Sequence, residues 1–356
     1  MILRSSICLS VLLSSLLLFG CSGDSPVETT PKADLAPVLS HTTNGIIISI
    51  YARLDTASVG LVDAATQLQS APSQANLDAA RNAWRTARVP WENSEAFLYG
   101  PVETQGIDPS IDSWPVNEVD LNAVLSGGAV LTREYIDGLE GTLKGFHTIE
   151  YLLFGTGGNK QIGNFTTREF EYLLAACRSL QGNTHALATA WHASGQNFGA
   201  NIINAGSSGS IYPSQKAAIE ELINGMLTIA DEVANGKIND PFSQQDVTLE
   251  ESRFSSNSKA DFQDNIRGIL SIYTGAYGTA TGSSVSDVVK TYNATLDTQF
   301  RNAVQSAIDK IGAIPGTFTD AIFANQAAVQ QAQTAVRAVQ QMLESQIIPL
   351  IDEKIQ

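Results

Sequence analysis

The stretch 44-NGIIISIYARLDTASVGLVDAATQL-68 determines the fold class of this 356-residue chain. Its apolar side chains recur at a period near 3.6 residues, at Ile48, Tyr51, Leu54, Leu61, Ala65 and Leu68. That period places them on one face of a helix, whereas a strand would need an alternation of two, which is scarce throughout the chain. The sequence therefore predicts an all-α protein.

Helical patterns continue on both sides of this stretch. Ser73 is a suitable N-cap for a second helix, which Pro90 kinks or ends. Near the C-terminus Pro315-Gly316 breaks the chain, and Thr319 is expected to cap a bundle helix of about thirty residues with an apolar stripe that reaches Ile347.

Gly- and Ser-rich sequence divides these helices into two sets. The segment 204–213 contains Gly206-Ser-Ser-Gly-Ser210 and is the best boundary. We predict a helical bundle over 38–205 and a second over 206–356. The segments 145–155 and 268–278 share both end glycines and one isoleucine, which leaves an internal duplication open.

The N-terminus predicts the cellular compartment. Arg4 precedes an apolar run over 7–19, and Gly20-Cys21 ends that run as in a bacterial lipoprotein signal. We expect residues 1–21 to be the signal, with Cys21 lipidated, and the Pro- and Ser-rich residues 22–37 to be a tether. The protein should be lipid-anchored in the cell envelope. Ser22 after the cysteine favours the outer membrane, with the protein facing the periplasm or the surface.

Charge and cysteine content exclude some partners and linkages. The formal net charge of -15 argues against binding to nucleic acid or to an anionic lipid surface. Removal of Cys8 with the signal and acylation of Cys21 would leave Cys177, which cannot form an intramolecular disulfide. Its helical spacing with neighbouring apolar residues predicts a core position.

Gly145-Phe146-His147-Thr148-Ile149-Glu150 places an imidazole and a carboxylate on one helix face. Together they can occupy two positions in the coordination shell of a metal, and Gly145 leaves room for a backbone or ligand to approach. The alternative is a buried histidine hydrogen-bonded to a nearby glutamate, with no ligand.

A second polar group lies upstream, where charged residues follow one side of a helix at Arg81, Arg85, Arg88, Glu92 and Glu95. Surface ion pairs would account for such a ladder. However, it is embedded among aromatic residues that usually pack on a core, so its charges should be partly desolvated and need partners. A metal ion or an anionic ligand would supply one. The loop that follows adds Asp108, Asp112 and Trp114.

These segments occur in the order found in imelysin-like envelope proteins, which essentially the whole mature chain resembles. The matching pieces are Trp91-Glu92-x-x-Glu95-x-Phe97-x-x-Gly100-Pro101, Asp112-x-Trp114-Pro115, Gly145-x-His147-x-x-Glu150, Glu251-Ser252-x-Phe254-Ser255 and Asp261-Phe262-x-x-Asn265-Ile266-x-Gly268. The resemblance implies a two-domain helical protein whose halves are similar to four-helix bundles, with a polar site near Gly-x-His-x-x-Glu. The family is classified among metallopeptidases, some members are linked to bacterial iron uptake, and some relatives bind cation-complexed polysaccharide.

By this resemblance the metal ligands would be His147, Glu150, Glu92, Glu95 and Asp112. The residues that line the cleft would be Arg88, Trp91, Trp114, Gly145 and Ser252. One imidazole with several carboxylates is an oxygen-rich set, so iron is favoured as the bound metal, with zinc or calcium as alternatives.

The residues argue against zinc proteolysis. Zinc-peptidase motifs supply two histidines from one helix, and here the position after Glu150 is Tyr151. His185 and His192 are separated by a helical rise of about 10 Å, too far to share an ion. His41 lies beside the tether.

Three functions therefore remain. The first is an envelope lipoprotein that binds a metal ion or a metal chelate in iron uptake, with an iron-uptake system or another envelope protein as partner. The second is a metallopeptidase. The third is a glycan- or protein-binding module without catalysis, in which the motif only connects helices.

Overall fold

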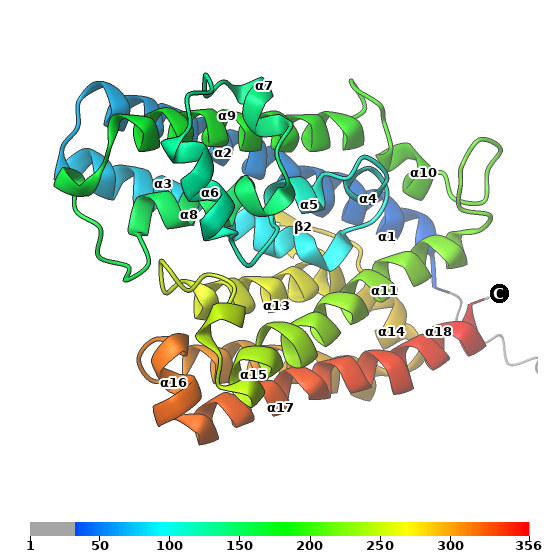
Figure 1. Ribbon diagram of the computed structural model, residues 1–356. Coiled ribbons are helices and arrows are strands. Elements are labelled where there is room, and N and C mark those ends of the chain that lie inside the picture. The colour runs from blue at the N-terminus through cyan, green and yellow to red at the C-terminus, as the bar shows by residue number, and fades with distance from the viewer. Residues whose placement is uncertain (1–32, 356) are drawn as a thin grey trace, which may run out of the picture. The chain divides into compact units, whose positions relative to one another are not determined.

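The computed structural model describes residues 33–355, which are almost entirely helical (Figure 1). The predicted signal 1–21, the lipidation site Cys21 and most of the predicted tether lie outside this range. The tether was expected to extend to residue 37, but helix α1 already begins at Leu35. Asp34 caps that helix by accepting a hydrogen bond from the backbone N–H of Ala36, and Leu35 and Val38 are buried.

The helices cover most of the described chain, and the only strands among residues 33–355 form a two-residue hairpin. The α-helices are α1 (Leu35–His41), α2 (Ile48–Ser70), α3 (Gln74–Ser94), α4 (Pro101–Thr104), α5 (Asp108–Ile111), α6 (Glu118–Ser126), α7 (Arg133–Asp137), α8 (Gly145–Phe154), α9 (Thr167–Trp191), α10 (Gly199–Ile203), α11 (Gln215–Glu232), α12 (Asn239–Gln244), α13 (Ser258–Thr274), α14 (Val285–Tyr292), α15 (Ala294–Gly312), α16 (Phe318–Ala324), α17 (Gln326–Met342) and α18 (Ile348–Lys354). Strands β1 (Ala276–Tyr277) and β2 (Ala280–Thr281) pair antiparallel.

Shorter helical turns connect these elements. The π-helical turns are η1 (Thr42–Ile47), η5 (Val233–Lys237) and η7 (Leu343–Ile347). The 3-10 turns are η2 (Glu95–Phe97), η3 (Gly141–Leu143), η4 (Ile162–Asn164) and η6 (Val247–Leu249).

The first group of helices is built on α2, whose neighbours are α3 and α9 (Figure 1). The predicted stripe from Leu54 to Leu68 is buried, as the helical period requires. By length and hydropathy the continuous helical run Leu35–Ser70 could cross a membrane. Its most apolar face nevertheless packs on protein, because Ile50, Leu54 and Leu61 are fully enclosed.

Local signals in α3 and α9 behave mostly as predicted. The Ser73 hydroxyl accepts a hydrogen bond from the backbone N–H of Asn76 and so caps α3. Pro90 lies inside α3 without ending it, and the helix continues to Ser94. Cys177 is buried in α9, where burial raises the pKa of its thiol.

A second group of helices contains α11, α13, α15 and α17, with α13 against α15 and α15 against α17 (Figure 1). The single long helix predicted from Thr319 is wrong at its start. Thr317 is the residue that caps α16, and the helix breaks at Asn325, where the backbone leaves the helical region. Helix α17 begins after this break and continues through η7 into α18.

The two groups meet closely along α3 and α13. A Cβ at Gly268 of α13 would lie 2.3 Å from the carbonyl oxygen of Asn93, and one at Gly225 of α11 would lie 2.4 Å from that of Ala96. Glycine at both places lets the backbones approach this closely. Residues 32–356 cluster as one compact unit by their contacts. The proposed division at 205/206 stays a prediction.

The possible internal duplication receives no support from the positions of its glycines. Gly145 is the first residue of α8 and has φ +75°, whereas Gly268 lies in the interior of α13. The two segments therefore occupy different places in their helices.

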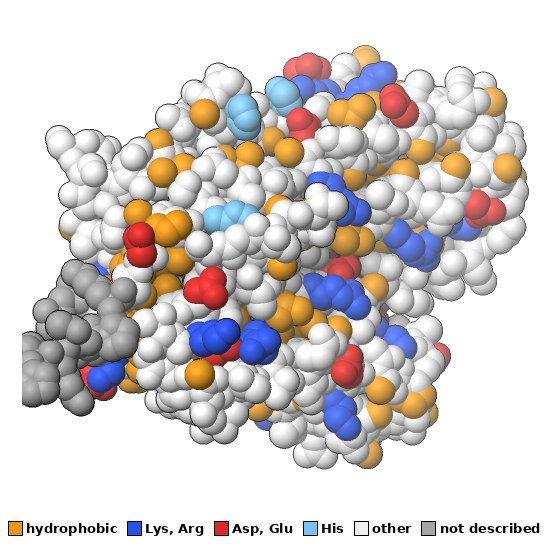
Figure 2. Space-filling model, turned by 180° about the vertical axis from the view of Figure 1, so that it is seen from behind, with side chains coloured by type: hydrophobic (Ala, Val, Ile, Leu, Met, Phe, Trp, Pro, Cys, Tyr) orange, Lys and Arg blue, Asp and Glu red, His pale blue; other side chains and the backbone are white. Residues whose placement is uncertain are grey.

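Charge is distributed differently outside and inside. On the face shown in Figure 2, basic and acidic side chains lie interspersed in small groups among uncharged atoms. In the interior, buried acidic side chains outnumber buried basic ones near α3, α8 and α13.

Candidate metal centre

A group of charged and polar residues lies buried between α3, α8, η5 and α13. We call it the buried polar cluster, and no member is more than 5% exposed. Its members are Arg88, Glu92, Glu95, Asp112, His147, Glu150, Lys237, Glu251, Asp261 and Asn265.

The backbone at Gly145 brings His147 to this cluster. Gly145 begins α8 with φ +75°, a conformation that other residues rarely adopt. A Cβ at this position would lie 2.4 Å from the carbonyl oxygen of Ile111. Glycine thus allows the first turn of α8 to pack on the end of α5, and this contact places His147 beside Asp112.

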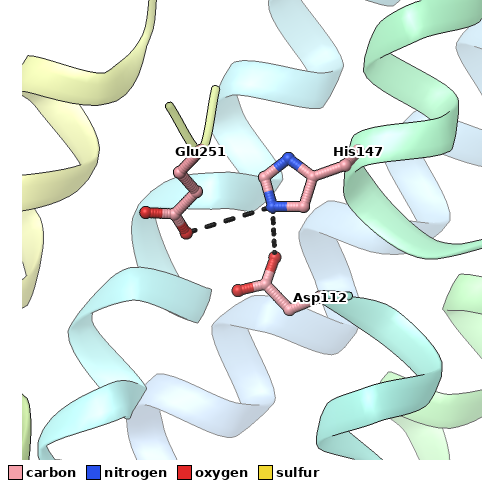
Figure 3. A group of neighbouring side chains, drawn as sticks. All are labelled: Asp112, His147 and Glu251. Atoms are coloured by element: carbon pink, nitrogen blue, oxygen red, sulfur yellow. Dashed lines mark ion pairs between the residues drawn. The ribbon is translucent and has the colours of Figure 1, made fainter. Parts of the chain in front are cut away.

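The imidazole of His147 faces two carboxylates with one nitrogen and a third with the other. Its Nε2 lies 3.1 Å from Oδ1 of Asp112 and 3.9 Å from Oε1 of Glu251 (Figure 3). Its Nδ1 lies 3.3 Å from Oε2 of Glu150. The other Glu150 oxygen accepts a hydrogen bond of 2.7 Å from the backbone N–H of Ser255. Both Glu150 oxygens are therefore engaged, and Glu150 orients the ring.

Burial alone would lower the pKa of His147, because it disfavours the charged ring. The adjacent carboxylates of Asp112 and Glu150 outweigh that effect and raise the pKa to about 9. Nε2 nevertheless makes no hydrogen bond of good geometry, despite its short distance to Asp112. It is a buried polar atom directed at acidic oxygens.

Arg88 holds four segments of the chain together. Its guanidinium forms ion pairs with Glu92 and Asp112, lies 2.9 Å from Oε1 of Glu251, and lies 3.5 Å from Oδ1 of Asp261. The planar fork of arginine suits such multiple pairing. The second oxygen of Asp112 accepts a hydrogen bond of 2.6 Å from Nε1 of Trp91.

Lys237 and Asn265 hold the other side of the cluster. The ammonium of Lys237 lies 2.7 Å from Oε2 of Glu95, 3.0 Å from Oε1 of Glu251 and 3.6 Å from Oε2 of Glu92. The amide of Asn265 donates hydrogen bonds to Oε2 of Glu92 at 2.6 Å and to Oε2 of Glu95 at 2.8 Å.

The cluster holds more acid than base. If all six of its carboxyl groups were ionised, their charges would exceed those of the two permanent cations, Arg88 and Lys237, by four, or by three with His147 protonated. Buried charge without a partner is costly. Burial accordingly raises the pKa of Glu92 and Glu95 well above the usual range, and that of Asp261 to about 6.

The remaining acceptors suit a cation. Oε2 of Glu251 and Oδ2 of Asp261 are buried without a hydrogen-bond partner, like Nε2 of His147. Two sets of residues each offer donor atoms that all lie within 4.8 Å of one another. The first set is Asp112, His147 and Glu251, and the second is Glu92, Glu95, Asp112 and Glu251. One nitrogen with several oxygens fits a hard or borderline metal ion.

The structure brings together all five residues predicted as metal ligands. Their ligand roles stay predictions, and Glu150 is placed to orient His147. The cleft-lining role of the second set stays a prediction, and four of its residues are buried, namely Arg88, Trp91, Gly145 and Ser252. They are enclosed because the charged groups satisfy one another between packed helices. Only Trp114 is partly exposed, with its ring 5.8 Å from the imidazole of His147.

Arg81 and Arg85, the other arginines of the charge ladder, form no ion pair with the described members of the cluster. Arg81 donates hydrogen bonds to the carbonyl oxygens of Leu153 and Lys160, and Arg85 to that of Ser255. Helical spacing predicted that the ladder residues share one side of the helix. Among its three arginines, only Arg88 forms an ion pair with α13, while Glu92 and Glu95 accept hydrogen bonds from Asn265 of that helix.

Four cluster residues were not predicted as part of the site. Glu251, Asp261 and Asn265 all lie in segments that match the family pattern, and Asp261 and Asn265 share a face of α13 at i and i+4. That spacing could have identified them. Lys237 has no such signal in the sequence.

The other histidines bind elsewhere within residues 33–355. Nε2 of His41 lies 2.8 Å from the carbonyl oxygen of Gly275, and Nδ1 of His185 lies 3.0 Å from Asp55. Nδ1 of His192 lies 2.8 Å from the Ser194 hydroxyl. In the described part of the chain the cluster therefore contains a single histidine.

Comparison with known proteins agrees with this arrangement of residues. Over 345 residues the chain is 30% identical to iron-regulated protein A of Synechococcus elongatus, which covers 93% of this chain and 92% of that protein. A crystal structure described as an iron-regulated protein A precursor from Parabacteroides distasonis superposes with a TM-score of 0.80 at 26% identity. The match covers 92% of this chain and 97% of the other.

The fold is also shared with an imelysin-like protein from Psychrobacter arcticum. That structure has a TM-score of 0.72 at 18% identity and covers 88% of this chain and 94% of its own. The sequence profile of the Imelysin family, Peptidase_M75, matches residues 47–346, which include every member of the buried polar cluster. The chain therefore belongs to the imelysin family.

Proposed function

We propose that this protein is a cell-envelope lipoprotein that binds a metal ion, with iron favoured, or a metal chelate, and that it serves iron uptake. The observation that carries the proposal is the excess of buried acid around an imidazole nitrogen without a hydrogen bond. A bound cation would offset this charge and satisfy these atoms together.

The residues that would hold the ion are Asp112, His147 and Glu251, with Glu92 and Glu95 as further oxygen donors. Glu150 orients the imidazole through Nδ1, which leaves Nε2 free to face the ion. An oxygen-rich set with one nitrogen favours iron or manganese over a structural zinc site, which prefers sulfur and nitrogen. Calcium and zinc are the competing ions to test.

The relatives support the link to iron, because two of them are described as iron-regulated protein A. We propose that lipidated Cys21 anchors the protein to the outer membrane. Its partner there would be an iron-uptake system or another envelope protein.

A metallopeptidase function has less support. The cluster is enclosed, and its charged side chains contact one another where a peptide would have to bind. Within residues 33–355 the cluster also contains one histidine, instead of the two that zinc peptidases of this type use. A glycan- or protein-binding module, with the cluster serving only to join helices, is the remaining alternative.

The experiment is a calorimetric titration of anaerobic protein with Fe²⁺. We expect the wild type to bind, and His147→Ala to lose at least about tenfold in affinity, since a ligand is removed. His185→Ala is the control, because that histidine is exposed and pairs with Asp55 away from the cluster. Equal binding by both variants and the wild type would contradict the proposal.

The same variants test the alternative functions. If the cluster only joins helices, His147→Ala should lower the melting temperature and the wild type should bind no metal. If the protein is a peptidase, it should cleave an unfolded protein substrate, and a chelator should abolish that cleavage.

A further inference from the structure

Lys237 places a positive charge among donors that could surround a metal ion. It ends the π-helical turn η5, and its side chain is fully buried. Its three carboxylate partners are Glu92, Glu95 and Glu251. The same three residues, together with Asp112, form the set of four whose oxygens could hold one cation. The ammonium therefore lies where a metal ion would find its ligands.

The two permanent cations of the cluster differ in how firmly they are held. Arg88 pairs with acids from four segments, so its removal would open the whole junction. Lys237 carries a compact charge on a flexible four-carbon chain. Besides its carboxylates, its ammonium has the ring of Trp114 at 5.5 Å. Lys237 is thus the cation that can withdraw while the helices stay in place.

A small acidic pocket reaches the cluster from outside, next to Lys237. Its volume is about 140 Å³, and Glu95 contributes to its wall. The remaining charged wall residues are Glu221 and Glu232, and among the described residues no lysine or arginine lines it. Glu221, Thr228 and Glu232 follow one face of α11, which the close approach at Gly225 holds against η2.

The charges of this pocket favour both the entry of a cation and the departure of Lys237. Burial raises the pKa of Glu221 and of Glu232, and for Glu232 this effect outweighs the opposing attraction of Lys237. Lys237 is electrostatically attracted to Glu232 as well as to the three cluster glutamates. A lysine that leaves the cluster would find an acidic partner at Glu232.

We propose that Lys237 is a displaceable internal cation. Its ammonium holds Glu92, Glu95 and Glu251 until a divalent ion enters through the acidic pocket, and it then moves toward Glu232. This inference rests on the proposed metal-binding function and concerns how that site is regulated.

The exchange would set the affinity of the site. An incoming ion must replace an ammonium that already satisfies three carboxylates, so part of the binding free energy is spent on displacement. When the ion leaves, the tethered ammonium returns to the same oxygens. A protein that passes metal to a partner needs such a site, because the ion must be released.

The test compares Mn²⁺ binding by the wild type and by Lys237→Met, measured by electron paramagnetic resonance of the free ion. We expect the variant to bind Mn²⁺ at least about tenfold more tightly, because the competing charge is gone and the carboxylates lack a partner. Lys160→Met is the matched control. Its ammonium pairs with Glu169 away from the cluster, at 2.7 Å, so its Mn²⁺ affinity should equal that of the wild type.

Two outcomes separate this inference from the function on which it rests. If the wild type binds Mn²⁺ and a folded Lys237→Met binds it no more tightly, the metal does not displace Lys237, but the proposed metal site is still supported. If neither protein binds Mn²⁺ or Fe²⁺, the proposed function itself fails, and the displacement fails with it.

A second measurement needs no variant of the cluster. Lysine acylation followed by mass spectrometry should find Lys237 nearly unreactive in the wild type alone, and at least about threefold more reactive with saturating Mn²⁺, because the side chain then lies in the pocket. Lys160 should show no change. Equal or lower labelling of Lys237 with Mn²⁺ would overturn the proposal even if Lys237→Met does not fold.

Discussion

Oε2 of Glu150 lies 3.3 Å from Nδ1 of His147, one turn earlier on α8, so the opposite ring nitrogen is directed at Asp112 and Glu251. The Gly-x-His-x-x-Glu motif therefore supplies one candidate ligand and the group that orients it. The second ring nitrogen finds its acidic neighbours in other segments.

This relationship predicts the effect of Glu150→Gln on metal binding. The amide keeps the size of the side chain but loses the charge that supports the imidazole, so Fe²⁺ affinity should fall by about 10- to 100-fold. Glu344→Gln, at an exposed position of η7, should bind Fe²⁺ like the wild type. Anaerobic calorimetry measures both. An unchanged affinity in Glu150→Gln would show that His147 does not need this partner.

A second prediction concerns the glycine that seats α8. Gly145→Ala should lower the free energy of unfolding by about 2–4 kcal/mol, since it adds both positive-φ strain and a clash with the carbonyl oxygen of Ile111. Gly106→Ala separates the two effects, because Gly106 has φ +61° but open space at the Cβ position. It should cost only about 1 kcal/mol. Urea denaturation measures the free energy of unfolding of both variants. Equal losses would contradict a clash between a Cβ at Gly145 and the carbonyl oxygen of Ile111.

The central ion pairs predict a third outcome. Arg88→Met should destabilise the protein by about 3–5 kcal/mol, because it leaves buried carboxylates without their cation. Arg133→Met is the control, since Arg133 and its partner Asp137 are both exposed. Its effect should stay below about 1 kcal/mol. Similar melting temperatures for the two variants would show that Arg88 is not the main support of the junction.

The pH dependence of stability can be tested at Asp108, at the start of α5. Burial, reinforced by nearby Asp112, raises the pKa of Asp108 to about 6. A carboxyl whose pKa is higher in the folded state favours folding when protonated, so its ionisation opposes folding above pH 6, and the penalty disappears as the pH falls toward 4. Asp108→Asn should therefore raise the melting temperature by ~1–3 °C at pH 7.5 and have little effect at pH 4.

Asp63→Asn serves as the control for that measurement, because Asp63 is exposed on α2. It should leave the melting temperature unchanged at both pH values. A loss of stability in Asp108→Asn at pH 7.5 would contradict the sign of the effect.

The helices could be predicted because their signals are local. The apolar period of α2 and the cap at Ser73 depend on residues within a few turns of one another. The break at Asn325 was missed because neither glycine nor proline marks it, and a continuous apolar stripe crosses it. The packing of α3 on α13 depends on residues far apart in the chain, and no local pattern reports it.

The site also contains residues that local sequence identifies and residues that it does not. His147 and Glu150 form a motif that can be recognised within one turn of helix. Lys237 comes from a π-helical turn without a motif, and its partners Glu92 and Glu95 lie far from it in the chain. The sequence shows which charges are present, but not that Arg88 and Lys237 are enclosed among them.

The central claim is that the buried polar cluster holds a metal ion. The most direct measurement is an anomalous difference map at the iron absorption edge, from crystals grown anaerobically with Fe²⁺. We predict one strong peak within bonding distance of Asp112, His147 and Glu251, and no such peak in His147→Ala. A map without a peak at the cluster, at an Fe²⁺ concentration that saturates binding in solution, would contradict it.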